Sequence, residues 1–499
     1  MFKGILSFSA AAALCAGTFF QPALANEKND LNVSVSSLMD TQTKLTTLVE
    51  KIDPNLPIIL QMTFGQAFLF GIDLTKPFGL VGDLTEDGNL AYAGFIPTKN
   101  QKMFDAQLAQ MRENGKLPEN IKIDSKDGYS VLLSNMELND EIPTFDNSRL
   151  LTVKLSPKVL VPLIPLVAEQ NKDLDPDKIR EQIEQMENVS FSLDINPESD
   201  VEVRYVGTPK ANTEIAGNFA NCEILSASNL CGFYDKNTDF GGQILGTFDE
   251  NNRRDFTRVL MLNEKFPQEL RDTVLLAMDV KKIDIAFSFD SDEKGISGVY
   301  AMGIANGKEV NARIEKAIQE MNEKPAEEKV VENSKGQANV RKNKNLNFHE
   351  ISFDETRILI AIHAKYLFAA VTSDGSDPYQ LLVPQLKALK KGEVKQNVTL
   401  HYDMNLLKSY FADADFDFAG KFNYAVDYEQ GKILAKFKAD GGIFQTIGRI
   451  KSLLAEKDGD SDMTDELFGD DDAADDESAN EMSEDAGEAS EEELGEIAD

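Results

Sequence analysis

The chain has 499 residues, with 85 Asp and Glu against 51 Lys and Arg, which gives a net charge of -34 at pH 7. Its hydrophobic fraction of 42% is normal for a globular protein and excludes a wholly disordered chain and a polytopic membrane protein. The negative charge also argues against nucleic-acid binding, because a phosphate backbone is held by clustered Lys and Arg.

The N-terminus has the pattern of an export signal, which we expect over residues 1–25. Lys3 supplies a short positive segment, an Ala-rich apolar stretch follows at 5–20, and Ala23-Leu24-Ala25 presents small residues where a signal peptidase cleaves. Lipidation at Cys15 is a less favoured alternative, because lipid attachment needs a small residue before the cysteine. We therefore expect an exported protein, located in the periplasm, at the cell surface or in the medium.

Two cysteines, Cys222 and Cys231, remain after the signal is removed. An even pair at short spacing in an exported chain predicts a disulfide, which would stabilise the fold by roughly 2–3 kcal/mol. A metal or redox pair is the alternative, but the spacing differs from a CxxC motif and no histidine lies nearby in the sequence. We therefore expect a Cys222–Cys231 disulfide.

Charge is concentrated at the C-terminus. Residues 456–499 contain 21 acidic residues and one basic residue, so this segment carries -20 of the net charge. It has almost no large apolar side chains and cannot bury enough surface to offset the entropy of ordering. We expect a disordered acidic tail that collects Ca²⁺ or Mg²⁺ loosely, with no cofactor. A second polar segment, 322–345, is expected to be a mobile loop inside a domain.

Between the signal and the tail, the same order of predicted elements occurs twice, at an offset of roughly 205 residues. In the first copy, a strand ending at 91–96 precedes the capping pattern Thr98-x-x-Gln101 and a helix. In the second copy, a strand at 299–304 precedes Asn306-x-x-Glu309 and a helix. The remaining predicted strands correspond at 129–133 and 357–371, at 150–155 and 398–403, and in long closing hairpins at 191–205 and 422–437.

Capping patterns predict further helices between the strands, at Ser37-x-x-Asp40 with a stop at Pro54, at Asp175-Pro176 and at Asn252-x-x-Asp255. Period-two alternation in the hairpins indicates a sheet with one buried and one wet face. Because the strands run in meanders and hairpins, we predict an α+β fold with two tandem similar units of antiparallel β-sheet faced by helices. The predicted units are 26–210 and 211–455.

Short motifs also suggest a relationship. Residues 71–79 read Gly-Ile-Asp-Leu-Thr-Lys-Pro-Phe-Gly, residues 94–97 read Gly-Phe-Ile-Pro, and residues 183–186 precede the hairpin that starts near Val189. Over most of residues 31–455 the chain resembles a family of secreted proteins from planctomycete-type bacteria, with Phe78 where such relatives usually have Trp. The resemblance implies a duplicated, exported fold, and it implies no activity and no site residues.

Three histidines, His349, His363 and His401, lie on predicted strands of the second copy. They would bind a metal only if they were neighbours on one face of the sheet, whereas the apolar sequence around His363 favours a histidine in the core. Asp235-x-Asn237-x-Asp239 begins like an EF-hand loop, but Phe240 occupies the position that requires Gly. We therefore predict no metal site.

Catalytic motifs are also lacking in the sequence. Ser291-x-x-Lys294 matches a β-lactamase-type pattern, but it lies in a polar turn and not at the start of a helix. The chain has no G-x-S-x-G, H-E-x-x-H, phosphate-binding or dinucleotide-binding pattern. We therefore predict no catalytic residues.

Two strongly apolar stretches, 56–72 and 159–167, are too short or too polar to span a membrane. The simplest interpretation is that they fill the core. The alternative is that they touch a lipid surface or line a hydrophobic groove between sheet and helices. The candidate groove residues are Leu60, Phe64, Phe68, Val161, Leu163 and Ile164.

The favoured hypothesis is an exported, non-enzymatic envelope protein that binds an apolar ligand or a protein partner between sheet and helices. The first alternative is a cell-surface structural or interaction protein whose acidic tail responds to cations. The second alternative is a hydrolase with an unrecognised site. We expect neither a nucleic-acid partner nor an integral membrane protein.

Overall fold

The computed structural model describes residues 29–457, apart from 116, 119, 138–141, 166–174, 224, 226, 249, 263–267, 293–294, 324–336, 344–345, 354–355, 388, 390 and 409–415. The chain divides into two compact units, residues 1–450 and 451–499, and in the second unit residues 451–457 are described, as the end of a helix. The predicted export signal at 1–25 and the predicted acidic tail beyond residue 457 lie outside the described residues, so both remain predictions.

The first half of the chain supplies strands and helices in alternating groups. Its strands are β1 (Leu31–Val35), β2 (Phe78–Leu84), β3 (Leu90–Pro97), β4 (Lys122–Lys126), β5 (Tyr129–Ser134), β6 (Leu151–Leu155), β7 (Met186–Ile195) and β8 (Val201–Pro209). Its helices are α2 (Leu38–Ile52), α3 (Leu56–Leu69), α4 (Gln101–Glu113), α5 (Pro157–Leu160), η1 (Val161–Leu163) and α7 (Pro176–Glu184), and α8 (Glu214–Glu223) opens the second half.

The second half also supplies strands and helices in alternating groups. Its strands are β10 (Phe240–Thr247), β11 (Lys282–Asp292), β12 (Gly295–Gly303), β13 (Gln337–Asn343), β14 (Leu346–Phe353), β15 (Thr356–Ile362), β16 (Tyr366–Thr372), β18 (Val398–Asp403), β19 (Lys421–Glu429) and β20 (Lys432–Ala439). Its helices are η2 (Cys231–Phe233), α9 (Glu250–Leu262), α10 (Gln268–Ala277), α11 (Gly307–Glu323), α12 (Pro378–Lys387), η3 (Met404–Leu407) and α13 (Gly441–Lys457). The short strands β9 (Ala227–Ser228) and β17 (Gly392–Glu393) pair with each other.

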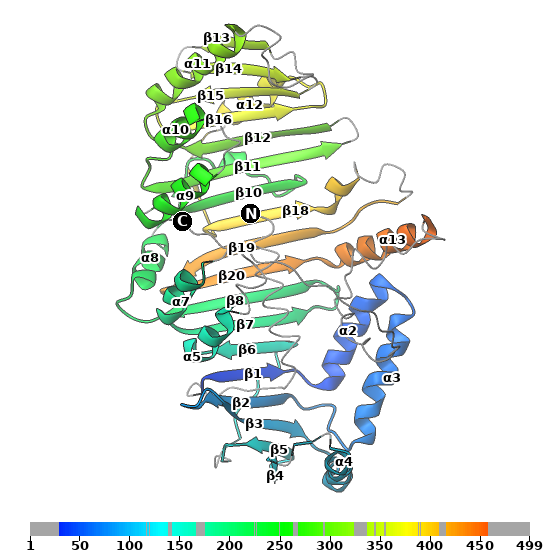
Figure 1. Cartoon of the computed structure of the whole chain (residues 1–499). Helices are drawn as coiled ribbons and strands as arrows, with labels where there is room; N and C mark the ends of the chain where they lie inside the picture. Colours follow the sequence, from blue (N-terminus) through cyan, green and yellow to red (C-terminus); the bar gives the residue numbers. More distant parts are fainter. Residues whose placement is uncertain are drawn as a thin grey trace, which may run out of the picture. The chain divides into compact units, whose positions relative to one another are not determined.

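The long strands form one antiparallel sheet of 18 strands (Figure 1). Their order is β4-β5-β3-β2-β1-β6-β7-β8-β20-β19-β18-β10-β11-β12-β16-β15-β14-β13. The predicted α+β class with an antiparallel sheet is confirmed. The two halves meet where β8 pairs with β20, so they share one continuous sheet.

The order of strands on the two sides of this junction can be compared directly. Outward from the junction, the first half runs β8-β7-β6-β1-β2-β3-β5-β4, and the second runs β20-β19-β18-β10-β11-β12-β16-β15 before β14 and β13 extend it. A pair of helices joins β1 to β2 and β10 to β11, and one helix follows β3 and β12.

The outer strands of the sheet are covered on both faces. On one face, α4 packs Phe104 against Ile96, and α11 packs Val310 against Ile362. On the other face, Leu382 of α12 packs in a cluster with the strand residues of the second half. Burial on both faces explains why β5, β15 and β16 read as nearly continuous apolar runs.

The helix starts predicted at Ser37 and Asp175 are confirmed, and the start predicted at Asn252 is wrong, because α9 already begins at Glu250. The Ser37 hydroxyl accepts a hydrogen bond from the Asp40 N–H at 3.2 Å at the start of α2, and Asp175 caps α7. The predicted cap of α4 at Thr98 is wrong, because Asn100 provides the cap. The Thr98 hydroxyl instead lies 2.8 Å from the Ser130 hydroxyl across the sheet.

Part of the segment 322–345 that we expected to be a loop forms a strand. Residues Gln337 to Asn343 are β13, which pairs with β14 at the edge of the sheet. Polar and charged side chains such as Arg341 and Lys342 are typical of edge strands, because they discourage pairing with another chain. The polar sequence of β13 therefore indicates an edge strand. A search for alternating apolar residues does not find such a strand.

The predicted disulfide is wrong, because Cys222 and Cys231 are both free thiols. The Cys222 sulfur lies 3.4 Å from the hydroxyl of Thr247, and the Cys231 sulfur lies 3.5 Å from the amide nitrogen of Gln243. These two contacts are four residues apart on β10, a rise of about 13 Å. A disulfide requires the two Cα atoms to be within about 7 Å, so the short spacing in sequence does not bring the thiols together.

We expect reductant to leave the stability of the protein unchanged. If both thiols are free, the urea midpoint measured without reductant should equal the midpoint measured with dithiothreitol. A disulfide across this loop would instead add roughly 2–3 kcal/mol that reduction removes. The control is to titrate the thiols of the denatured protein with and without dithiothreitol. Fewer reactive thiols in the sample without dithiothreitol would contradict the structure.

Asp200 fixes the junction between the halves. One carboxylate oxygen accepts a hydrogen bond from the Gly441 N–H at 2.9 Å, and the other accepts from Lys438 at 2.5 Å and from Asn196 at 2.9 Å. Burial by itself raises the pKa of the Asp200 carboxyl, but the hydrogen bonds from Lys438, Gly441 and Asn196 outweigh burial and hold this pKa below its ordinary value. The carboxylate therefore ties the start of β8 to the end of β20 and the start of α13.

The substitution Asp200→Ala is expected to lower the free energy of unfolding by about 1–3 kcal/mol, because it leaves the buried Gly441 N–H without its acceptor. Urea denaturation followed by circular dichroism measures this loss. Glu198→Ala, an exposed change in the same turn, is the control and should stay within about 0.5 kcal/mol of the unchanged protein. Equal effects of the two substitutions would contradict the assigned role of Asp200.

Candidate functional site

The seven central strands, from β1 through β6, β7, β8, β20 and β19 to β18, carry only apolar and aromatic side chains on one face. A single row across the sheet shows this arrangement: Val35, Leu151, Leu193, Val203, Phe437, Tyr424 and Leu400 pair in turn. The complete set, which we name the apolar face, is Leu31, Val33, Val35, Leu151, Val153, Leu155, Val189, Phe191, Leu193, Ile195, Val201, Val203, Tyr205, Ile433, Ala435, Phe437, Ala439, Phe422, Tyr424, Val426, Tyr428, Val398, Leu400 and Tyr402.

The opposite side of the same strands, the polar face, has different chemistry. The neighbouring row runs through Thr152, Ser192, Arg204 and Lys436. Glu202 lies on this face and forms ion pairs with Arg204 and Lys436. Burial raises the pKa of the Glu202 carboxyl, but the hydrogen bonds from Lys436 and Arg204 outweigh it and lower the pKa overall. The polar face is therefore suited to water.

The apolar face is only partly covered. Val189, Ile195, Val426 and Ala439 are buried, whereas its other members are half-buried. Its coverage comes from the ends of the strands, where Figure 1 shows α5, α7 and α8 on one side and α2 and α13 on the other. On α8, the ring of Phe219 lies 5.3 Å from that of Tyr428, and Ile443 of α13 packs in the cluster that contains Phe422 and Phe437.

Tyrosines on the apolar face report its environment. Burial raises the pKa of Tyr205 to about 12, with the nearby Tyr424 adding to the shift. Burial likewise raises the pKa of Tyr428 to about 12 and raises that of Tyr424. These phenols therefore keep their protons at neutral pH and place hydroxyl groups within an otherwise apolar surface.

The six candidate groove residues lie in two separate places. Leu60 and Phe64 are half-buried on α3, where the side chain of Phe68 lies outside the described residues. Val161 and Leu163 are half-buried on η1, and Ile164 just after it is buried at 3% exposure.

The topology keeps these two segments apart. The helices α2 and α3 follow the C-terminal end of β1, whereas η1 follows the C-terminal end of β6. β1 and β6 are antiparallel, with Leu31 paired with Leu155, so the two segments lie at opposite ends of the strands (Figure 1). They do not line one groove, and the apolar surface between the helices comes from the strands instead.

The three histidines do not converge. His349 on β14 is fully buried with its Nε2 2.8 Å from the side-chain oxygen of Asn311, and His363 is exposed. His401 on β18 lies 2.8 Å from the Thr238 carbonyl oxygen. Six strand steps separate β18 from β14, about 29 Å at the usual spacing, and the register places His349 and His401 on opposite faces. Burial lowers the pKa of the His349 and His401 imidazoles, which favours their neutral form.

Acidic groups near the predicted EF-hand-like segment are used in local structure. The Asp235 carboxylate accepts hydrogen bonds from the backbone and side chain of Asn237, each at 2.9 Å, and Asp239 accepts from the Ser291 N–H at 2.9 Å. Among the described residues, no group of three or more His, Cys, Asp or Glu side chains is arranged to hold a metal ion.

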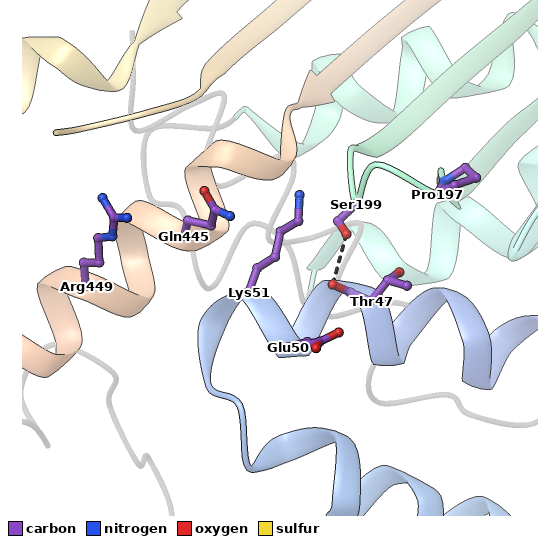
Figure 2. A pocket seen from close by; sticks show the side chains of 7 residues that line it. All are labelled: Thr47, Glu50, Lys51, Pro197, Ser199, Gln445 and Arg449. Atoms are coloured by element: carbon purple, nitrogen blue, oxygen red, sulfur yellow. Dashed lines mark hydrogen bonds between the residues drawn. The ribbon is translucent and has the colours of Figure 1, made fainter. Parts of the chain in front are cut away.

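A separate polar pocket of about 480 Å³ lies where α2, the β7–β8 turn and α13 meet (Figure 2). Thr47, Glu50 and Lys51 line it from α2, and Arg449 lines it from α13. The Ser199 hydroxyl donates to the Thr47 carbonyl oxygen at 3.0 Å and joins the turn to the helix. The residues that line this pocket include one carboxylate and two cations, which offer charged and neutral hydrogen-bond partners.

Comparisons of the chain with protein-family models, curated proteins and solved structures yield no match. The resemblance to secreted planctomycete-type proteins therefore remains a prediction. Within the described part of the chain, no helix is both long enough and apolar enough to cross a membrane.

Tyrosine ionisation tests whether the apolar face shields its phenols. Tyr300 lies on β12, three strands beyond β18. Burial raises the pKa of Tyr205, Tyr428 and Tyr300 to about 12, and we expect all three to ionise well after exposed tyrosines. An alkaline titration followed by phenolate absorbance measures this, and Tyr205→Phe should remove part of the late phase. Ionisation of all tyrosines near pH 10 in the folded protein, as expected in denaturant, would contradict the assigned environment.

Proposed function

We propose that this protein is an exported, non-enzymatic binding protein whose ligand is an apolar molecule, such as an acyl chain, held on the apolar face. The observation that carries the proposal is the uninterrupted apolar row across seven paired strands, most of whose members are half-buried. A contiguous apolar surface that is only partly covered is a candidate site of interaction with ligands, lipids or proteins.

The geometry supports a binding role in two ways. The half-buried members of the apolar face follow one another from strand to strand across the seven central strands, which suits an extended ligand. The hydroxyl groups of Tyr205, Tyr424 and Tyr428 lie within this surface and offer hydrogen-bond partners to a carbonyl or ester group.

The side chains of the apolar face offer contact and orientation, and they include no carboxylate, imidazole or thiol. The histidines that a hydrolase would need lie on different strands and faces. We therefore favour binding over hydrolysis as the function of this face.

We also propose that the two halves are copies of one unit, residues 26–210 and 211–455. The matching strand order on both sides of the β8–β20 junction and the matching helix insertions support this proposal. Joining the copies edge to edge makes one apolar face from two smaller ones.

The first test is native mass spectrometry of the protein purified from its own envelope, with organic extraction of what co-purifies. A stoichiometric acyl lipid is the expected result. A ligand-free mass that stays unchanged after addition of lipid extract would overturn the proposal.

A pair of substitutions on β7 tests the face itself. Leu193→Gln places a polar side chain on the apolar face, and Ser192→Gln places the same side chain on the polar face one residue away. We expect Leu193→Gln to weaken binding of the fluorescent fatty acid cis-parinaric acid about 10-fold, because a buried amide without a partner is costly, and Ser192→Gln to leave it unchanged. Circular dichroism checks that both variants are folded. Equal affinities of the two variants would contradict the assignment.

A further inference from the structure

Helix α3 exposes large apolar side chains. None of its 14 residues is Asp, Glu, Lys or Arg. Ile58, Ile59 and Met62 are 61%, 59% and 70% exposed, and their spacing places them on one side of the helix. Another side of α3 packs against α2. A helix that has no charged residue and is mostly apolar belongs in a protein core or in contact with lipid, and this side of α3 is not in the core.

The second half of the protein supplies a comparison. α10 occupies the corresponding place, as the second of two helices between β10 and β11. Its exposed residues include Gln268, Glu269 and Asp272, which are polar or charged. This position in the fold therefore does not require an apolar exterior, so the apolar surface of α3 has another cause.

Two further exposed apolar side chains lie near the C-terminal end of α3. Met39 and Met103 are 53% and 41% exposed. The Met39 N–H donates to the Leu74 carbonyl oxygen at 3.0 Å, and Gly71 packs closely against the Cβ atom of Met103. We name Met39, Ile58, Ile59, Met62 and Met103 the α3 patch.

Lysines lie beside the same end of α3. Lys99 and Lys102 are exposed, Lys76 is half-buried, and the Lys99 N–H donates to the Gly71 carbonyl oxygen at 2.9 Å. The hydrogen bond from Thr75 lowers the pKa of the Asp73 carboxyl, and the charges of Lys76 and Lys99 lower it further, which shows that both ammonium groups are close to this corner. In a chain with a net charge of -34, a group of cations beside an apolar patch is complementary to anionic headgroups above acyl chains.

We propose that the α3 patch docks the protein on an anionic lipid surface. Ile58, Ile59 and Met62 enter the boundary between headgroups and acyl chains, and the lysines contact lipid phosphates. At 1.5 Å per residue, α3 is about 21 Å long, shorter than the roughly 30 Å hydrocarbon core, so it lies in the interface without spanning it. This docking does not depend on ligand binding by the apolar face.

Vesicle flotation of the purified protein tests the proposal. We expect the protein to float with vesicles of about seven parts phosphatidylcholine to three parts phosphatidylglycerol. Ile58→Ser with Met62→Ser should lower the bound fraction about 10-fold or more, because these side chains then supply no apolar area to the membrane. The control is Met261→Ser with Ile296→Ser, which removes exposed apolar side chains elsewhere and should leave flotation unchanged.

The lysines are tested with the same assay. Lys99→Gln with Lys102→Gln should weaken flotation several-fold on vesicles that contain phosphatidylglycerol and leave it unchanged on pure phosphatidylcholine, since each lysine near an anionic surface contributes to attraction. Leu193→Gln should float like the unchanged protein, which separates docking from ligand binding.

Absence of flotation, or equal losses in the two Ser double variants, would overturn the proposal. A dimer of the unchanged protein in light scattering, without vesicle binding, would also overturn the proposal if the variant Ile58→Ser with Met62→Ser were a monomer. The occupant of the α3 patch would then be a second copy of the chain.

Discussion

The pairing of β8 with β20 is the constraint on which the rest of the structure depends. Its register opposes Val203 to Phe437 and Glu202 to Lys438, so it aligns the apolar face of one half with that of the other. A shift of one residue would turn every side chain of one half to the wrong side of the sheet. Asp200 stabilises this register through its hydrogen bonds to Lys438 and Gly441. The width of the apolar face therefore depends on one pair of strands.

The two faces of the central strands have separate roles. On the polar face, ion pairs around Glu202 are partly exposed, so each contributes modestly to stability, while their charges keep that face in water. On the apolar face, aromatic pairs such as Phe422 and Phe437, whose ring centroids are 5.6 Å apart, cover one another laterally and keep each ring half-buried. This lateral packing lets the sheet hold an apolar surface without a full layer of helices above it.

Local patterns in the sequence predict much of this fold. Alternation at Phe191, Leu193 and Ile195 predicts a strand with one apolar face, and Ser37 and Asp175 mark true helix starts. Local patterns do not predict which distant strands pair. The pairing of β1 with β6 and the pairing of β8 with β20 leave no signal in the local sequence. The candidate groove therefore centres on the apolar runs at Leu60 and Leu163, whereas the widest apolar surface comes from strands whose register the sequence does not show. The disulfide failed for the same reason, since proximity in sequence is not proximity in space.

The separation of the two junction strands along the chain has a consequence for biogenesis. β20 is synthesised roughly 220 residues after β8, so the first half emerges with β8 as an open edge beside its apolar surface. An open edge next to exposed apolar side chains is a template for association with other chains. A ribosome that stalls between the halves would release such a fragment, and a chaperone that holds the nascent chain until residue 439 has emerged would prevent its aggregation.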